Sequence, residues 1–235
     1  MKRTIPILAL LFLAIACSKN DSPPSTTIRF EYAEEEINTT FRTAGSIAPS
    51  IIQWNGEVGT YSITSSSEIL QRNHIVFDSL TGLLSWGKDF PLGTYDFVIT
   101  AESEGRTQTV QILLTNTLTK AFFSGGLQMV APDLEDINYS EIPPDYSLSL
   151  NEDGTIYMER YSNPAFEASG TWAAVSGGSL LIEFTTNLSG GDVTYMRGFL
   201  SNSLEFPSFL GTYGSGIDEN QEIENRIGIF RFHWD

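Results

Sequence analysis

The chain has 235 residues and a formal net charge of -16, because 29 Asp and Glu outnumber 13 Lys and Arg. So acidic a chain has no positive surface for a phosphate backbone, which excludes nucleic acid as an expected partner. One cysteine excludes an intramolecular disulfide, and two histidines, His74 and His233, are too few for a zinc or other transition-metal cluster. The hydrophobic fraction of 41% is that of a folded chain.

Residues 1–16 have the pattern of a signal segment. Two basic residues follow Met1, and the apolar run over residues 5–15 is too short to cross a bilayer. The stretch from Leu13 to Cys17 (LAIAC) resembles the lipobox of bacterial lipoproteins. This resemblance implies cleavage before Cys17 and lipidation of that cysteine. An ordinary secretory peptide or a buried core thiol is the alternative that the residues leave open.

Residues 17–27 are polar, small and proline-containing, a composition that predicts a flexible tether. The lipoprotein resemblance implies an anchor of several acyl chains, which would hold the protein on a membrane. It also implies the outer membrane, at its periplasmic or cell-surface face. Without residues 1–16 the chain keeps 11 Lys and Arg and all 29 acids, so the anchored form carries -18.

Residues 28–117 are predicted to form one β domain, because apolar and polar residues alternate and turn residues separate the runs. No segment of the mature chain shows a convincing amphipathic helix. The number and spacing of the runs match an Ig-like β-sandwich without its disulfide. The predicted strands cover residues 28–33, 36–43, 49–53, 58–64, 74–77, 83–86 with 94–101, and 106–115.

Two neighbouring segments of this domain, Phe77–Trp86 and Pro91–Ala101, resemble bacterial cadherin-like or immunoglobulin-like modules. In those modules an Asp-x-x-Thr-Gly turn precedes Pro-x-Gly-x-Tyr and a long strand that ends in Thr-Ala. The resemblance implies the same sandwich. Gly82 and Gly93 lie at the hairpin corners, where a positive φ is expected.

Residues 120–235 are predicted to form an eight-stranded antiparallel barrel. Short turns such as Asn151–Gly154 and Ser189–Asp192 separate consecutive strands, and closing the sheet removes its exposed edges. The predicted strands cover residues 122–130, 146–150, 154–161, 168–174, 179–186, 193–201, 204–210 and 225–234.

Three segments of this domain resemble the lipocalin-like domains of bacterial lipoproteins: Tyr146–Thr155, Ala168–Trp172 and Leu180–Phe184. The first matches their Leu-x-Leu-x-x-Asp-Gly-Thr hairpin, and the second matches their Gly-x-Trp. The resemblance implies an all-β fold that ends in a lipocalin-like barrel. In true lipocalins the first strand carries Gly-x-Trp, and this chain has Phe123–Leu127 there instead. The resemblance therefore does not imply small-lipid transport.

Two groups of acidic residues occupy long loops between the predicted strands. They are Asp133, Glu135, Asp136, Glu141 and Asp145 in the first loop, and Asp218, Glu219, Glu222 and Glu224 in the second. Closely spaced carboxylates are the ligands that Ca²⁺ prefers, but neither loop matches an EF-hand. Solvated acidic loops are the simpler interpretation. Because long ordered loops tend to be functional, we expect a partner surface there, with Ca²⁺ as a secondary hypothesis.

Catalysis is not expected, because no Gly-x-Ser-x-Gly elbow with acid and base partners is present. We expect His233 on the polar face of its strand and His74 in a solvated turn. Trp54, Tyr139 and Tyr213 are candidate aromatic contacts for a sugar or peptide.

These features predict a non-catalytic, lipid-anchored accessory or binding subunit of an outer-membrane complex, whose partner is an envelope protein or a glycan. The alternative is a solitary surface lipoprotein that captures a glycan or small ligand in its barrel. An open lumen lined by small or polar residues would favour the ligand binder. A lumen filled by Phe and Leu would favour the accessory subunit.

Overall fold

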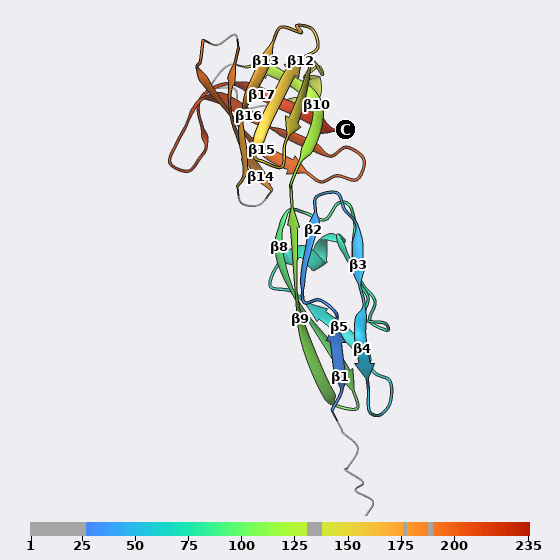
Figure 1. Cartoon of the computed structure of the whole chain (residues 1–235). Helices are drawn as coiled ribbons and strands as arrows, with labels where there is room; N and C mark the ends of the chain where they lie inside the picture. The colour runs from blue at the N-terminus through green and yellow to red at the C-terminus, as the bar shows by residue number, and fades with distance from the viewer. Residues whose placement is uncertain (1–26, 131–137, 176–177, 188–189) are drawn as a thin grey trace, which may run out of the picture.

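The computed structural model describes residues 27–130, 138–175, 178–187 and 190–235. These residues form an all-β protein with two short 3-10 helices and no α-helix. Figure 1 shows an N-terminal region and a barrel arranged one after the other, with β1 starting at the end of the N-terminal region that lies away from the barrel. Within the described chain, no helix has the length and apolar character needed to cross a membrane.

The N-terminal region contains small sheets, which confirms the predicted β architecture. A four-stranded sheet has the order β2-β9-β8-β5, a three-stranded sheet β3-β7-β6, and β1 pairs with β4. All pairs are antiparallel except β2 with β9. The strands are β1 (Arg29–Tyr32), β2 (Glu36–Thr40), β3 (Gly45–Ile47), β4 (Pro49–Gln53), β5 (Thr60–Thr64), β6 (Ile75–Phe77), β7 (Leu84–Trp86), β8 (Gly93–Ser103) and β9 (Arg106–Thr117), with the 3-10 helix η1 (Glu68–Arg72) before β6.

One hydrophobic core joins these sheets. Along β8 the buried residues Phe97, Ile99 and Ala101 alternate with more exposed ones, and β9 buries Ile112 and Leu114 in the same way. This period of two is the alternation that the sequence shows, since successive side chains of a strand point to opposite faces.

The barrel is closed by eight antiparallel strands, as predicted. Each strand pairs with the next along the chain, and the last returns to the first, with Phe123 opposite Trp234. The strands are β10 (Ala121–Met129), β11 (Tyr146–Leu150), β12 (Thr155–Arg160), β13 (Glu167–Ala174), β14 (Ser179–Thr186), β15 (Val193–Ser201), β16 (Ser208–Ile217) and β17 (Ile223–Trp234), with the 3-10 helix η2 (Tyr139–Glu141) before β11.

The barrel lumen is filled with side chains. Phe123, Met158, Ile182, Phe230 and Phe232 are all fully buried within one cluster. Phe230 packs against Phe209 with 4.6 Å between ring centroids. An eight-stranded barrel is just wide enough for its own side chains to fill, and this one is filled. The lumen is therefore lined and filled by aromatic and aliphatic side chains of the barrel itself.

Interior glycines let neighbouring strands approach closely enough to close this small barrel. A Cβ added at Gly170 on β13 would lie 1.9 Å from the carbonyl oxygen of Glu183 on β14. A Cβ at Gly211 on β16 would lie 2.0 Å from the carbonyl oxygen of Arg197 on β15. Glycine at such positions allows the strong coiling of a closed sheet.

Three strand predictions need correction. The short strand β3 (Gly45–Ile47) was not predicted. The run drawn as 83–86 with 94–101 forms two separate strands, β7 and β8, which belong to different sheets. The last difference is β16, which occupies Ser208–Ile217 rather than 204–210. Leu204 and Phe206 instead lie in the loop before β16 and are 63% and 65% exposed. An apolar run was therefore mistaken for a strand, while the glycine-rich segment after it forms the strand.

The N-terminal region and the barrel contact each other around the short connection from β9 to β10. Arg42 donates from Nη1 to the carbonyl oxygen of Ser203 at 2.9 Å and from Nη2 to that of Leu204 at 3.3 Å. The ring of Phe41 lies 5.3 Å from that of Trp234 in an edge-to-face contact. The two regions therefore share a packed junction.

Candidate functional site

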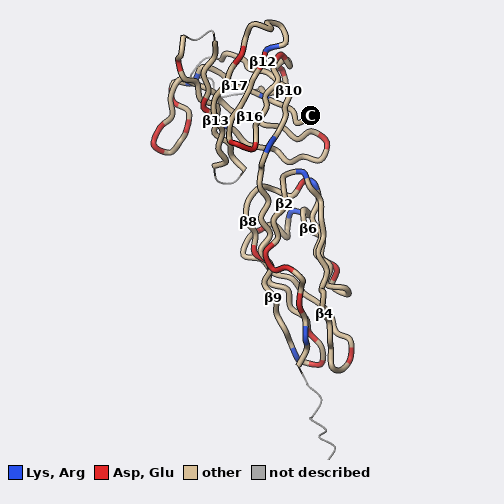
Figure 2. Tube along the Cα trace, in the orientation of Figure 1, with Lys and Arg blue, Asp and Glu red and all other residues tan. Residues whose placement is uncertain are grey.

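The turn between β16 and β17 carries the second acidic cluster and projects from the barrel. Figure 2 shows acidic residues at its tip. Asp218 Oδ1 accepts backbone hydrogen bonds from Asn220 and Glu222, both at 2.8 Å. These bonds, with that from Glu222 the largest cause, hold the pKa of Asp218 below its usual value. Arg197 anchors the turn through Glu222 at 3.0 Å, while Glu219 is exposed.

The carboxylates of this turn do not form a ligand set for Ca²⁺. Asp218 uses one carboxylate oxygen on backbone amides and Glu222 pairs with Arg197. Among the residues that the structure describes, no three His, Cys, Asp or Glu side chains are arranged to hold a metal ion. Three residues of the first acidic loop, Asp133, Glu135 and Asp136, lie outside the described residues, as does Cys17.

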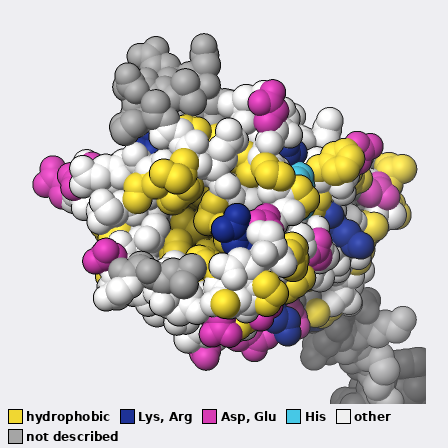
Figure 3. All heavy atoms as spheres, turned by 90° about the horizontal axis from the view of Figure 1, so that it is seen from above, with side chains coloured by type: hydrophobic (Ala, Val, Ile, Leu, Met, Phe, Trp, Pro, Cys, Tyr) yellow, Lys and Arg dark blue, Asp and Glu magenta, His cyan; other side chains and the backbone are white. Residues whose placement is uncertain are grey.

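A hydrophobic hollow lies on the face seen in Figure 3. At the end of the barrel where β11 begins, Leu127, Tyr146, Phe166 and Ile227 are partly buried against the barrel core. Arg160 lies at this end too, with its guanidinium carbon 5.4 Å from the centroid of the Tyr146 ring.

Asp145 holds Arg160 in this position by accepting from its Nε at 2.6 Å. Asp145 also accepts from the hydroxyl of Ser162 at 2.7 Å. The Ser162 hydroxyl first, and then Arg160, lower the pKa of Asp145. Asp145, which the sequence assigns to an acidic partner loop, is therefore a structural residue that fixes the end of β12.

The three predicted aromatic contacts do not form one platform. Trp54 packs on Tyr61 in the N-terminal core, with 5.2 Å between ring centroids. Tyr139 lies on η2, half-buried beside β17, and burial raises its pKa. Tyr213 is a core residue of the barrel and only 8% exposed. Period-two patterning does not tell which face of a strand is covered, so exposed and core aromatic residues look alike in the sequence.

The expectation of a solvated His74 is wrong. Its Nδ1 lies 2.9 Å from Asp89 Oδ2, and both side chains are about one-fifth exposed. Asp89 lies 15 positions further along the chain, and no local pattern signals the pair. His233 lies on the outer face of β17, where burial first and Arg231 second lower its pKa.

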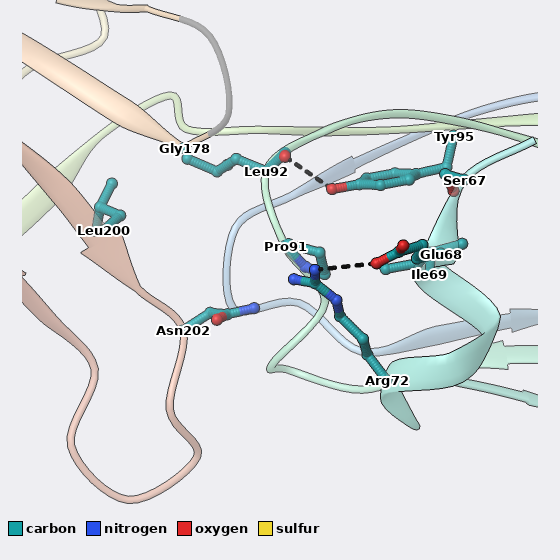
Figure 4. Close-up of a pocket in the computed structure, with 10 residues that line it drawn as sticks. All are labelled: Ser67, Glu68, Ile69, Arg72, Pro91, Leu92, Tyr95, Gly178, Leu200 and Asn202. Atoms are coloured by element: carbon teal, nitrogen blue, oxygen red, sulfur yellow. Dashed lines mark hydrogen bonds and ion pairs between the residues drawn. The ribbon is translucent and has the colours of Figure 1, made fainter.

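A cavity of about 490 Å³ lies at the junction of the two regions. Figure 4 shows Glu68 and Arg72 of η1 on one side and Asn202 and Leu200 of the barrel across from them. Its lining is formed by Ser67, Glu68, Ile69, Arg72, Pro91, Leu92, Tyr95, Gly178, Leu200 and Asn202. A second cavity of about 240 Å³ shares Leu92 and Gly178 with the first and is also lined by Asn116.

One wall segment, residues 89–92, contributes Pro91 and Leu92 to the first cavity and Leu92 to the second, and its four carbonyl oxygens each accept a side-chain hydrogen bond. Asn202 Nδ2 donates to Asp89, and Asn116 Nδ2 donates to Phe90 at 2.7 Å and to Pro91 at 3.1 Å. Tyr95 Oη donates to Leu92 at 3.0 Å (Figure 4). The wall is therefore fixed from β8, β9 and the barrel.

Sequence reasoning missed this cavity. Among its polar residues only Tyr95 belongs to a pattern noted in the sequence, the Pro-x-Gly-x-Tyr of the immunoglobulin-like resemblance. Glu68 and Arg72 are separated by one turn of η1 and form an exposed pair at 3.6 Å. Asn202 comes from the other region, so no local spacing could connect them.

Burial of Tyr213 predicts a loss of stability at alkaline pH. Burial first, and then Tyr146, raise its pKa to about 12. An unfolded tyrosine ionises near pH 10, so the contribution of Tyr213 is fully present below about pH 10 and is lost as the pH rises towards 12. Urea unfolding at about pH 9 and about pH 11 should show this decline, and the decline should be smaller in Tyr213→Phe. An equal decline in both proteins would assign the effect to the other tyrosines.

Comparisons with known proteins assign no family. The chain matches no protein-family model and no curated protein. Among solved structures, a quinonprotein alcohol dehydrogenase-like protein from Bacteroides thetaiotaomicron matches at 9% identity and a TM-score of 0.27, covering 83% of this chain and 69% of that one. Domains 5 and 6 of the S-layer protein SbsC match at 9% identity and a TM-score of 0.28, covering 88% of this chain and 98% of that one. Likenesses this distant carry no inference about function.

Proposed function

We propose that the protein is a lipid-anchored lipoprotein of the outer membrane that acts as a non-catalytic accessory or binding subunit of an envelope complex. The observation that carries the proposal is the position at which the described chain begins, relative to the barrel. The described chain starts at the end of the N-terminal region away from the barrel (Figure 1). An anchor at Cys17, followed by a polar tether, would therefore hold the N-terminal region next to the membrane and present the barrel away from it.

Two further features support this proposal. The sequence resembles lipoproteins at Leu13–Cys17, and cadherin-like and lipocalin-like modules in its two β domains. The barrel lumen is packed with aromatic and aliphatic side chains, which leaves recognition to the outer surface. On that surface the acidic turn of residues 218–222 is well ordered by its own hydrogen bonds and by Arg197.

The anchor is tested by metabolic labelling with a palmitate analogue. We expect the native protein to be labelled and to sediment with membranes, and the Cys17→Ala variant to be unlabelled. Labelling should not change in a Ser18→Ala control, because the lipoprotein resemblance places the lipid on Cys17 and not on its neighbour. An unlabelled native protein would overturn the anchor.

The partner surface is tested by pull-down of the intact lipoprotein from detergent-solubilised membranes. The variant Glu219→Gln/Glu222→Gln removes two charges and leaves Asp218 to shape the turn. We expect it to recover less of the membrane partner, because complementary charges accelerate association. A matched control, Glu34→Gln/Glu35→Gln, removes the same charge from exposed positions before β2. Equal recovery of the partner by both variants would exclude the turn as the partner surface. Absence of a stoichiometric partner would exclude the role of an accessory subunit.

A further inference from the structure

The junction cavities have the polarity of a site for a neutral, polyhydroxylated ligand. Glu68 and Arg72 contribute one negative and one positive group, so the lining has no net charge. Glu68 accepts hydrogen bonds and Arg72 donates them. Their own contact is 3.6 Å long and both side chains are largely exposed, at 75% and 66%. Both groups are thus available to hydroxyl groups, each of which can donate and accept.

The side-chain amide oxygens of Asn202 and Asn116 are two further hydrogen-bond acceptors at these cavities. Asn202 uses Nδ2 on the carbonyl of Asp89, which leaves Oδ1 without a partner among the described residues. Asn116 is 3% exposed and lines the smaller cavity, and its Oδ1 has no hydrogen-bond partner in the described chain. A buried polar atom without a partner is rare in folded proteins, and a hydroxyl group that reached Asn116 would satisfy it.

Apart from Ser67 and Tyr95, the remaining lining is apolar. Pro91, Leu92 and Leu200 face the cavity between the polar groups (Figure 4). Such surfaces suit the C–H faces of a sugar ring, while the polar groups suit its hydroxyls. Because all four carbonyl oxygens of residues 89–92 are already bonded, the wall is preorganised, which reduces the entropy lost on binding. The volume of about 490 Å³ falls within the range of small-molecule sites.

We propose that this junction binds a carbohydrate, with Glu68, Arg72 and Asn202 holding its hydroxyl groups. An anionic ligand fits less well, since Arg72 is opposed by Glu68, by the amide oxygens and by a chain of net charge -16. The inference goes beyond the proposed function, which requires neither this cavity nor a sugar. It concerns the junction and not the barrel lumen.

The test uses residues 17–235 with Cys17→Ala, so that the whole mature chain is present and unlipidated. Saturation-transfer NMR is recorded with free glucose, galactose, mannose and N-acetylglucosamine, and with acetate as an anion. We expect transfer to at least one sugar and none to acetate. Transfer to no sugar, or to acetate alone, overturns the proposal. The experiment involves no membrane or partner, so its failure is distinct from a failure of the subunit hypothesis.

Location is tested by two matched double variants. Glu68→Ala/Arg72→Ala removes the cavity pair, and Arg29→Ala/Glu31→Ala removes another exposed pair without changing net charge. We expect the Kd of the sugar to rise at least about tenfold in the first and to stay within about twofold in the second. Equal affinities overturn the proposed location. Circular dichroism checks the fold, and Arg72→Met provides the same comparison with a single change.

Discussion

Replacing Phe230 with alanine is expected to lower the free energy of unfolding of the barrel by about 3 to 5 kcal/mol. Phe230 is fully buried on β17 and packs between Phe209 and Phe232, with centroid distances of 4.6 and 6.0 Å. Removing its ring takes away the transfer free energy of the buried carbons and leaves a cavity that a closed barrel cannot collapse to fill. Urea unfolding followed by tryptophan fluorescence measures the loss, since Trp172 and Trp234 both pack on this core.

The matched control is Phe199→Ala, which removes the same ring from the outer face of β15. Phe199 is 59% exposed, so its loss should change stability by less than about 0.5 kcal/mol. Equal losses from the two variants would show that the lumen is not the packed core described here.

Gly170→Ala is expected to be the most damaging single-methyl addition in the barrel, with a loss of about 3 kcal/mol. The new Cβ would lie 1.9 Å from the carbonyl oxygen of Glu183 and 2.6 Å from Cα of Phe184. Both are backbone atoms of β14, so no side-chain rotation can relieve the clash and the two strands must separate. The same denaturation experiment, read at the barrel, measures the effect.

Gly216→Ala on β16 is the control for Gly170→Ala. Its Cβ would come no closer than 3.5 Å to Glu224, an ordinary contact, and its φ is not positive. We expect a change of less than about 0.5 kcal/mol. A similar loss at both glycines would contradict a specific requirement for close strand approach at Gly170.

Most of the barrel could be predicted because most strands carry a period-two signal and several connections carry a recognisable turn. The runs at Tyr146–Leu150, Ser179–Thr186 and Val193–Ser201 match the observed strands at both ends. At β16 the prediction fails because Gly211 and Gly214 interrupt the apolar pattern, although close strand approach requires glycine at Gly211. Local composition indicates a loop at these glycines, whereas the geometry of closure makes them part of a strand.

The junction site could not be predicted, because its residues meet only in three dimensions. Asn202 reaches Asp89 across 113 positions of sequence, and Arg42 reaches Ser203 across 161. The same reason explains the pairing of His74 with Asp89. The acidic loops were a visible feature of the sequence, yet Asp145 and Asp218 use their carboxylates to shape backbone turns. Charge alone therefore did not distinguish a partner surface from local structure.

The parallel pairing of β2 with β9 determines how the N-terminal region would respond to tension. Thr40 lies opposite Thr117, and β9 continues through residues 118–120 into the barrel. Force applied between the start of β1 and the barrel would pull β2 and β9 in opposite directions along their length (Figure 1). All hydrogen bonds of the pair would then be loaded in shear and would have to break together. The pair would therefore resist separation more strongly than a strand pair whose hydrogen bonds are loaded one at a time.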